Sequence, residues 1–245
     1  MPEPLLEVEN VSKRFGGFVA LEGINLSVMQ GERVGLIGPN GSGKSTLVNC
    51  MCGTLHNETG TVRFDGHPVD GLEAHERTHR GMARSFQLPR PFHTLTVSEN
   101  LRIPLLYTVA RRRGAHLTMA ENSARCDELC SLVGLADKAH KMPRDLTQVE
   151  MRKLELARAM AADPKLLIAD EAMAGLSQSE VADIVALLIK LNERGITIIM
   201  IEHIMRAVMS FSQRLVVLVS GKKIADGKPE DVVNNPEVVG AYLGQ

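Results

Sequence analysis

Residues 38–46 form a glycine-rich segment that could hold a nucleoside triphosphate. They fit the pattern G-x-x-x-x-G-K-[ST] and lie between an apolar strand and a helix, which weighs against a chance turn. Glycines let such a loop wrap its N–H groups around phosphates, while Lys44 adds positive charge at the β- and γ-phosphates and the Ser45 hydroxyl can ligate Mg²⁺. The residues expected in this cradle are Gly38, Pro39, Asn40, Gly41, Ser42, Gly43, Lys44, Ser45 and Thr46.

A second candidate group follows the apolar run KLLIAD. Asp170 and Glu171 come where a buried strand would emerge beside the phosphate loop. Asp170 suits the Mg²⁺ shell, and Glu171 suits a general base for the attacking water. An acidic pair after a strand is a weak signal alone, but downstream of a phosphate loop it becomes a strong one. The two groups together predict hydrolysis of a nucleoside triphosphate.

Strands and helices alternate on both sides of a helical stretch. Alternating apolar residues predict strands in the first 30 residues, and RVGLIG is a short strand before a helix that ends on Gly53. Asp65-Gly66 indicates a hairpin. From about 88 to 160 strands give way to helices, expected near 97–108, 119–133 and 150–162. The alternation then resumes, which predicts an α/β core of largely parallel strands with a helical insertion.

Composition and charge limit the partners. The 245 residues carry 28 Lys plus Arg against 29 Asp plus Glu, a net charge of -1, which argues against a nucleic-acid-binding surface. No apolar run approaches the roughly 18–20 residues that span a bilayer, and the N-terminus MPEPLLEVEN is acidic where a signal peptide would be basic. The four cysteines are expected as buried free thiols, because Cys50 and Cys52 are too close for a zinc knuckle.

Several segments carry a family resemblance. GPNGSGKST, FQLPRPFHTLTVSENL, LELARAMAADPKLLIADEAMAGLSQSE and ITIIMIEHIMRAVM resemble the ATP-binding subunit of an ABC transporter over essentially the whole chain. RFGGFVAL, IEH and NNPEVVGAYLGQ resemble the branched-chain (hydrophobic) amino-acid uptake branch. The resemblance implies a P-loop NTPase (RecA-like) core with an antiparallel β-subdomain, formed by residues 1–87 and 162–245. Residues 88–161 would form an inserted α-helical subdomain that carries the signature segment.

The resemblance assigns roles to single positions. Phe15 would stack on adenine, Gln87 would touch Mg²⁺ and sense the transport channel, and His203 would contact the γ-phosphate. Residues 174–177, AGLS, would cross the interface of a dimer. Core packing, a polar strand end and a helix cap are the plainer alternatives for Phe15, Gln87 and His203. The chain departs from the family pattern at Ala172, Ser177 and Ile204.

The segment LTQVE at 146–150 stands where the family usually carries LSGGQ, which completes the phosphate site of a second subunit. Thr147 keeps a hydroxyl, and this branch tolerates a residue of the size of Gln148. Val149 would hold the backbone away from the anion, and a Glu150 carboxylate roughly 8 Å from a phosphate would cost about 2 kcal/mol at an effective dielectric constant near 20. We therefore expect a heterodimer with one competent and one weakened site, and a homodimer is the alternative.

The leading prediction is a subunit that hydrolyses ATP with Mg²⁺ to power an importer. Its partners would be transmembrane permease subunits, a second ATP-binding subunit and, indirectly, a periplasmic or extracellular solute-binding protein. It would lie peripherally on the cytoplasmic face of the inner membrane. Branched-chain amino acids are the family default, and urea, amides or aromatic acids stay open. The alternatives are a regulatory subunit with little turnover and a soluble ABC-type switch protein.

Three further stretches are open to other interpretations. Residues 75–79, His-Glu-Arg-Thr-His, satisfy the zinc-protease pattern H-E-x-x-H, but they fall on a short helix without an obvious third ligand, so a solvated helix face fits better. Arg111–Arg113 are expected in a solvated loop, with contact to a partner or to anionic headgroups as the alternative. LPRPFHTLTVSENL corresponds to the family's docking surface for a permease loop.

Overall fold

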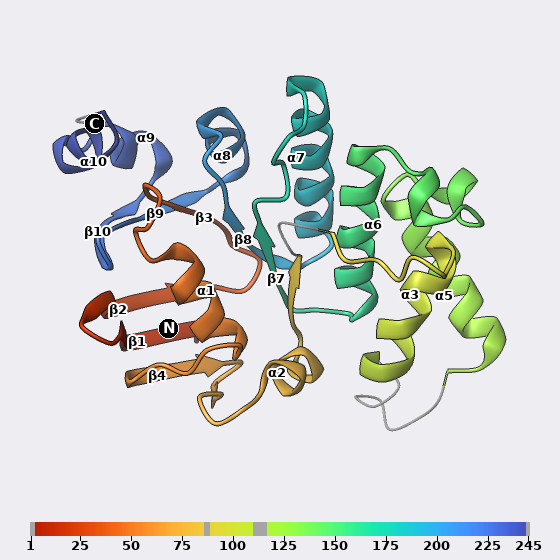
Figure 1. The fold of residues 1–245 in the computed structure, drawn as a ribbon, viewed down its shortest axis with the longest axis horizontal. Coiled ribbons are helices and arrows are strands. Elements are labelled where there is room, and N and C mark those ends of the chain that lie inside the picture. Colours follow the sequence, from red (N-terminus) through yellow and green to blue (C-terminus); the bar gives the residue numbers. More distant parts are fainter. Residues whose placement is uncertain (1–2, 86–88, 110–116, 244–245) are drawn as a thin grey trace.

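The chain folds into two sheets and a group of helices, seen in a computed structural model that describes residues 3–85, 89–109 and 117–243 (Figure 1). The antiparallel sheet has the order β2-β1-β4-β5, with β1 at Leu6–Phe15, β2 at Phe18–Val28, β4 at Thr59–Phe64 and β5 at His67–Pro68. The second sheet has the order β10-β9-β3-β8-β7-β6, with β3 at Arg33–Ile37, β6 at Met82–Ser85, β7 at Leu166–Asp170, β8 at Thr197–Ile201, β9 at Arg214–Val219 and β10 at Lys222–Gly227.

The second sheet positions the candidate site. Its strands are parallel except for the edge strand β10, and most of their residues are buried, as continuous apolar runs predict. The predicted α/β fold is therefore confirmed. Because parallel strands end at one edge, the residues that follow β3, β7 and β8 meet there. The helices that follow these three strands are α1 (Lys44–Cys52), α7 (Gln178–Glu193) and α8 (Met205–Phe211).

The antiparallel sheet ends in the hairpin that the sequence predicts. Asp65 and Gly66 connect β4 to β5 with φ values of +53° and +75°. Two successive residues with positive φ form the tight turn that suits the twist of the flanking strands. The buried side of this sheet packs in one hydrophobic cluster with α1 and with residues of β3, β7 and β8. The sheet is thus held against the helix that begins at Lys44.

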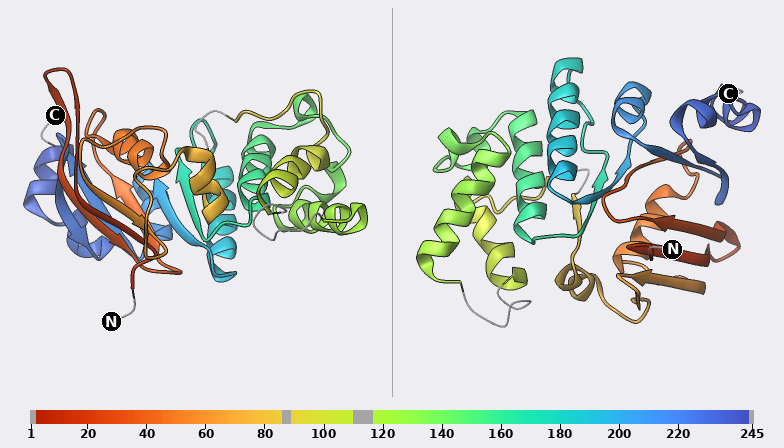
Figure 2. Two further views of the ribbon diagram at one scale, coloured as in Figure 1. Left: turned by 90° about the horizontal axis from the view of Figure 1, so that it is seen from below. Right: turned by 180° about the vertical axis from the view of Figure 1, so that it is seen from behind.

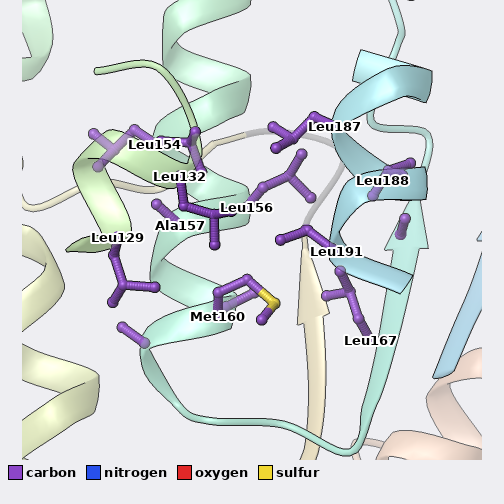
Figure 3. Close-up of a cluster of buried hydrophobic side chains, with 14 of the residues drawn as sticks. Leu129, Leu132, Leu154, Leu156, Ala157, Met160, Leu167, Leu187, Leu188 and Leu191 are labelled. Atoms are coloured by element: carbon purple, nitrogen blue, oxygen red, sulfur yellow. The ribbon is translucent and has the colours of Figure 1, made fainter. Parts of the chain in front are cut away.

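A group of helices forms the end of the molecule opposite the antiparallel sheet (Figure 2). It contains α3 (Val97–Pro104), α5 (Met119–Leu132) and α6 (Gln148–Ala161). Figure 3 shows leucines of α5 and α6 in one buried cluster with Leu187, Leu188 and Leu191 of α7 and with Leu167 of β7. The helical group and the parallel sheet therefore share a core, so they are packed together over a broad apolar surface.

The predicted helix at 97–108 changes its hydrogen bonding partway. The α-helix ends at Pro104, and Leu105–Val109 continue as a π-helix. Proline has no N–H to donate and its ring displaces a preceding carbonyl, so regular α-helical bonding stops there. The last segment of the chain, for which the sequence pattern predicts no element, contains β10, α9 (Pro229–Val233) and α10 (Pro236–Leu243). Over the described ranges, no helix is both long and apolar enough to cross a membrane.

Arg77 ties α2 (Ala74–Arg80) to the end of α1 from a position that is 1% exposed. Its Nη1 donates to the carbonyls of Cys50 and Met51 at 2.7 and 2.8 Å, and its Nε donates to Leu72 at 3.0 Å. A cation stabilises the C-terminal end of a helix, where carbonyls lack intrahelical donors. Arg77 therefore anchors the helix that follows the phosphate loop. The cysteines are buried free thiols, as predicted.

Candidate active site

The segment 38–46 forms a loop between β3 and α1, and two of its glycines, Gly38 and Gly43, are packed against neighbouring backbone. A Cβ atom at Gly38 would lie 2.1 Å from the carbonyl oxygen of Leu218, and one at Gly43 would lie 2.6 Å from that of Ala20. Gly43 also has φ +103°, which side chains rarely adopt. The loop therefore cannot carry side chains at these two positions, and its backbone is free to face an anion.

Lys44 begins α1 and bends back over the loop. Its Nζ donates to the carbonyls of Gly38 and Pro39 at 2.7 and 3.0 Å. Burial lowers the pKa of Lys44, and the negative charges of Glu171 and Asp170 oppose that shift. Beside it the Ser42 hydroxyl is buried without a hydrogen-bond partner among the residues that the structure describes. A bound phosphate would supply an acceptor to both side chains, so this cradle fits a nucleotide.

Asp170, the last residue of β7, is buried and paired with an arginine from the adjacent strand. Arg84 of β6 donates from Nη2 to Asp170 Oδ2 at 2.5 Å and from Nη1 to Asn49 Oδ1 at 2.7 Å. Asn49 lies on α1, so the guanidinium bridges the helix after the phosphate loop to the acidic strand end. Oxygen ligands such as the Asp170 carboxylate and the exposed Ser45 hydroxyl suit Mg²⁺.

Glu171 has the left-handed backbone conformation, with φ +46°. Its N–H donates to the carbonyl of Ile201 at the end of β8, at 2.9 Å. A non-glycine residue in this region stores strain, and such strain gathers at functional sites. The half-buried carboxylate is thereby placed at the sheet edge where β8 leads into His203. The His203 side chain is 66% exposed.

Phe15 ends β1 with half of its surface exposed, and the Lys13 ammonium lies 5.7 Å from the centre of its ring. An exposed aromatic ring is able to stack on a base. Gln87 lies outside the described residues, as do Arg111–Arg113.

The LTQVE segment caps α6, which begins at Gln148, two residues before the predicted start. The Thr147 hydroxyl accepts the N–H of Glu150 at 3.4 Å, and the Glu150 carboxylate accepts the N–H of Thr147 at 2.9 Å. This reciprocal capping box satisfies one donor at each position. No acceptor in the described part of the chain bonds the N–H groups of Gln148 and Val149. The helix end therefore keeps two free donors.

The Glu150 carboxylate, for which the sequence predicts a cost to a nearby phosphate, has a counterion in the same chain. Its Oε1 forms a short ion pair with Lys138, and that hydrogen bond lowers the pKa of Glu150. Lys138 stands in a 3₁₀ turn (Ala136–Lys138) that precedes the segment. Val149 packs half-buried against the helical core. The Glu150 carboxylate is thus paired with a counterion of its own chain. Its electrostatic repulsion of a phosphate is therefore smaller than the repulsion expected from an unpaired charge.

Gln148 and Arg152 hold the loop that follows the acidic pair. Both side chains donate to the carbonyl of Ala174 at 3.3 Å. Ala174 begins the AGLS stretch at 174–177. The helix that carries LTQVE is therefore bonded to this loop within the same chain.

The H-E-x-x-H pattern lies on α2. The rings of His75 and His79 are 6.0 Å apart in an edge-to-face arrangement, and His79 Nε2 lies 3.1 Å from the carbonyl oxygen of Tyr107. The Glu76 carboxylate accepts the N–H of Glu73. Within the described residues no three His, Cys, Asp or Glu side chains gather as a metal site.

Two residues near the site escaped the sequence reasoning. Arg84 and Glu202 are charged residues in or beside apolar strands, MARSF and ITIIMI. A charge in such a position needs a partner, because burying an unpaired charge is costly. That signal could have pointed to both residues, although not to the identity of their partners.

Comparisons with known proteins agree on one family. A family model described as ABC transporter matches residues 21–174, and one described as branched-chain amino acid ATP-binding cassette transporter matches residues 222–245. The chain is 38% identical to the high-affinity branched-chain amino acid transport ATP-binding protein BraF of Pseudomonas aeruginosa, with 100% of each chain covered.

Solved structures of ATP-binding cassettes have the same fold as this chain. An ATP-binding cassette of an ABC transporter in its ADP conformation has a TM-score of 0.85 and 30% identity, with 99% of each chain covered. A dimeric ATP-binding cassette in a post-hydrolysis state, bound to ADP and Pi, has a TM-score of 0.80 and 27% identity, with 91% of this chain and 98% of that chain covered.

Proposed function

The chain belongs to the ABC transporter family of ATP-binding cassettes, and from that premise we propose that it powers uptake of branched-chain or related amino acids. The observation that carries the proposal is the meeting of the phosphate loop, the Asp170–Glu171 pair and His203 at one sheet edge. The relative BraF is a branched-chain amino acid transport protein by name, and the C-terminal match to a branched-chain family model supports the same solute class.

In the proposed binding step, ATP places its phosphates in the cradle of residues 38–46. Lys44 Nζ exchanges the carbonyls of Gly38 and Pro39 for phosphate oxygens, and Ser42 gains an acceptor. Phe15 stacks on adenine. Ser45 and Asp170, with Gln87, would hold Mg²⁺, which neutralises phosphate charge when bound. Arg84 bonds one of the two carboxylate oxygens of Asp170, Oδ2, so the arginine and the metal would share this carboxylate.

In the proposed chemical step, the Glu171 carboxylate accepts a proton from the water that attacks the γ-phosphorus. The bond to the β,γ-bridging oxygen breaks, which leaves ADP and inorganic phosphate. His203 donates to a γ-phosphate oxygen and stabilises the charge there. Glu171 lies close enough to Lys44 for its negative charge to act on the lysine ammonium.

We propose that a second cassette completes each site and that this second cassette is a different chain. The support is Val149, whose β-branched side chain replaces the glycine that lets backbone approach an anion, even though Glu150 is neutralised by Lys138. The free N–H groups of Gln148 and Val149 and the Thr147 hydroxyl would still make a weak contact with the partner's ATP. A homodimer is the alternative that the test below decides.

A groove between α2, β6 and the helical group suits the permease. It encloses about 370 Å³, and its lining includes Phe92, Tyr107, Glu155 and Arg158. Phe92 and Tyr107 are exposed apolar side chains, while Arg158 pairs with Glu155 at 3.0 Å and lies over the Phe92 ring. An exposed apolar surface with a polar rim is typical of protein contacts. Docking here would hold the chain peripherally at the cytoplasmic face of the membrane.

The test is ATP hydrolysis by the full chain, alone and with the membrane subunits and cassettes that purify with it from native membranes. We expect slow hydrolysis alone, faster hydrolysis with a second cassette, and loss of about 10² or more in rate on Glu171→Gln in this chain. Val149→Gly should raise the rate of the lone chain. Brisk hydrolysis by the lone homodimer would contradict the heterodimer, and an unaffected Glu171→Gln complex would identify a regulatory subunit instead.

A further inference from the structure

Glu202 is a buried carboxylate that the mechanism above leaves without a role. It directly follows β8, and its side chain is 0% exposed, whereas the adjacent His203 side chain is 66% exposed. Burying a carboxylate is costly unless it is bonded or paired, and an apolar residue would fill the same space at lower cost. Its presence at the site edge therefore calls for a function.

The carboxylate connects two parts of the site. Its Oε1 accepts the backbone N–H of Met173 at 2.9 Å, and its Oε2 lies 3.8 Å from His203 Nδ1 and 3.4 Å from the His203 backbone nitrogen. Arg152 contributes a positive charge and Glu171 a negative one. Burial raises the pKa of the Glu202 carboxyl, and the Met173 N–H and His203 oppose that shift.

The contact with Met173 helps to hold the strained loop. Glu171 has φ +46°, and its N–H donates to Ile201, while the N–H of Met173 donates to Glu202. Two consecutive residues at the end of β8 thus hold the loop after β7 by two bonds. A strained backbone persists when its surroundings over-determine it.

We infer that Glu202 is a positioning residue that orients His203 relative to Glu171. Its Oε2 holds a proton on Nδ1 of the His203 ring, and the doubly protonated ring then presents its Nε2–H to the γ-phosphate. Its Oε1 fixes the loop that carries Glu171. The inference rests on the proposed function, because it acts through His203 and Glu171. A carboxylate that sets the tautomer and orientation of a histidine is a recurring device in active sites.

Two variants test the contacts that the two carboxylate oxygens of Glu202 make. Glu202→Gln keeps an oxygen that can accept from Met173 but removes the charge that faces His203, whereas Glu202→Leu removes both. In the full chain assembled with its partners we expect both variants to lower kcat about tenfold or more, with the KM for ATP changed less than about twofold. Glu193→Gln, an exposed change at the end of α7, is the matched control and should leave both constants unaltered.

The histidine itself gives a second readout, which reports the protonation of the ring and not the rate of hydrolysis. In nucleotide-bound chain with ¹⁵N-labelled histidine, the His203 signals, identified by their loss in His203→Ala, should show protons on both Nδ1 and Nε2 in the wild type. Glu202→Gln should alter them and leave the other histidines unchanged. A wild-type ring protonated on Nε2 alone would overturn the inference, as would normal kcat in Glu202→Gln. If His203→Ala or Glu171→Gln hydrolysed ATP normally, the proposed function would fail instead.

Discussion

Arg84 and Asp170 form an ion pair of 2.5 Å between neighbouring parallel strands, and the same guanidinium reaches Asn49 of α1. The Asp170 carboxylate, which is expected to bind Mg²⁺, is thus already bonded to a guanidinium. A metal that arrives with the nucleotide would share the carboxylate with the arginine, so the positive charge of Arg84 should weaken its binding by an amount that can be measured.

Replacing Arg84 should strengthen Mg²⁺ binding. In Arg84→Met the Asp170 carboxylate loses a fixed positive charge, so the Mg²⁺ concentration that half-saturates nucleotide binding should fall about threefold or more. Calorimetric titration with Mg²⁺ at fixed ATP analogue measures this value. Arg63→Met, an exposed change on β4, is the control. A weaker response to Mg²⁺ in Arg84→Met would mean that the arginine prepares the carboxylate for the metal.

A side chain at position 43 should disrupt the phosphate loop. In Gly43→Ala the new Cβ would lie 2.6 Å from the Ala20 carbonyl at a φ of +103°. The backbone has to move, so ATP affinity should fall about tenfold or more. Fluorescent nucleotide binding measures the change, and Gly71→Ala, where the added Cβ meets nothing within 4 Å, should bind normally. Equal affinity in both variants would contradict the cradle geometry.

Loss of Arg77 should destabilise the whole chain. Arg77→Met leaves the carbonyls of Cys50 and Met51 without their donor in a buried place, which we expect to lower the free energy of unfolding by about 3 kcal/mol. Urea unfolding measures it. Arg80→Met changes an exposed residue of the same helix and should cost less than about 0.5 kcal/mol. Similar values for the two variants would exclude an anchoring role for Arg77.

The ion pair of Lys138 and Glu150 should stabilise the folded chain only in a defined pH range. The hydrogen bond from Lys138 lowers the pKa of Glu150, so its contribution to stability is present above the unfolded pKa of about 4.3 and is lost as pH falls through the lower folded value. Lys138→Met should therefore be less stable than wild type near neutral pH, and the difference should vanish under strong acid. Thermal unfolding at several pH values measures it. A difference that grows with acid would contradict the pairing.

Lys138→Met should also weaken contact with the nucleotide of the second cassette, because the Glu150 charge is then uncompensated. Adding Glu150→Gln should restore ATP-driven association, measured by ultracentrifugation with the partner cassette. If the double variant stays as weak as Lys138→Met, the lysine acts by some other route.

The fold was largely predictable because its strongest signals are local. RVGLI, LLIAD and TIIMI are apolar runs of strand length, and Asp65-Gly66 and Gly53 mark a turn and a helix end through the backbone conformations that they favour. The sequence pattern predicts the start of α6 two residues too late, at residue 150. The observed helix begins at Gln148, because Thr147 caps it. The π-helix after Pro104 left no distinct pattern in the sequence.

The contacts of the candidate site were less predictable, because they join residues that are distant along the chain. Arg84 meets Asp170 across two strands that are separated by the whole helical group. Lys138 meets Glu150 only because a 3₁₀ turn brings the chain back beside α6. Residue types and spacing favoured a phosphate loop and an acidic pair, but the counterions of the acidic groups depend on tertiary packing.

The bond from Gln148 to the carbonyl of Ala174 fastens the segment expected to meet the neighbour's ATP to the loop behind this chain's own Glu171. A displacement of the segment that contacts one nucleotide would then shift the loop beside the other nucleotide within the same polypeptide. This coupling would not depend on the membrane subunits. The two cassettes of such a dimer would therefore change conformation together even if only one of the two sites hydrolysed ATP.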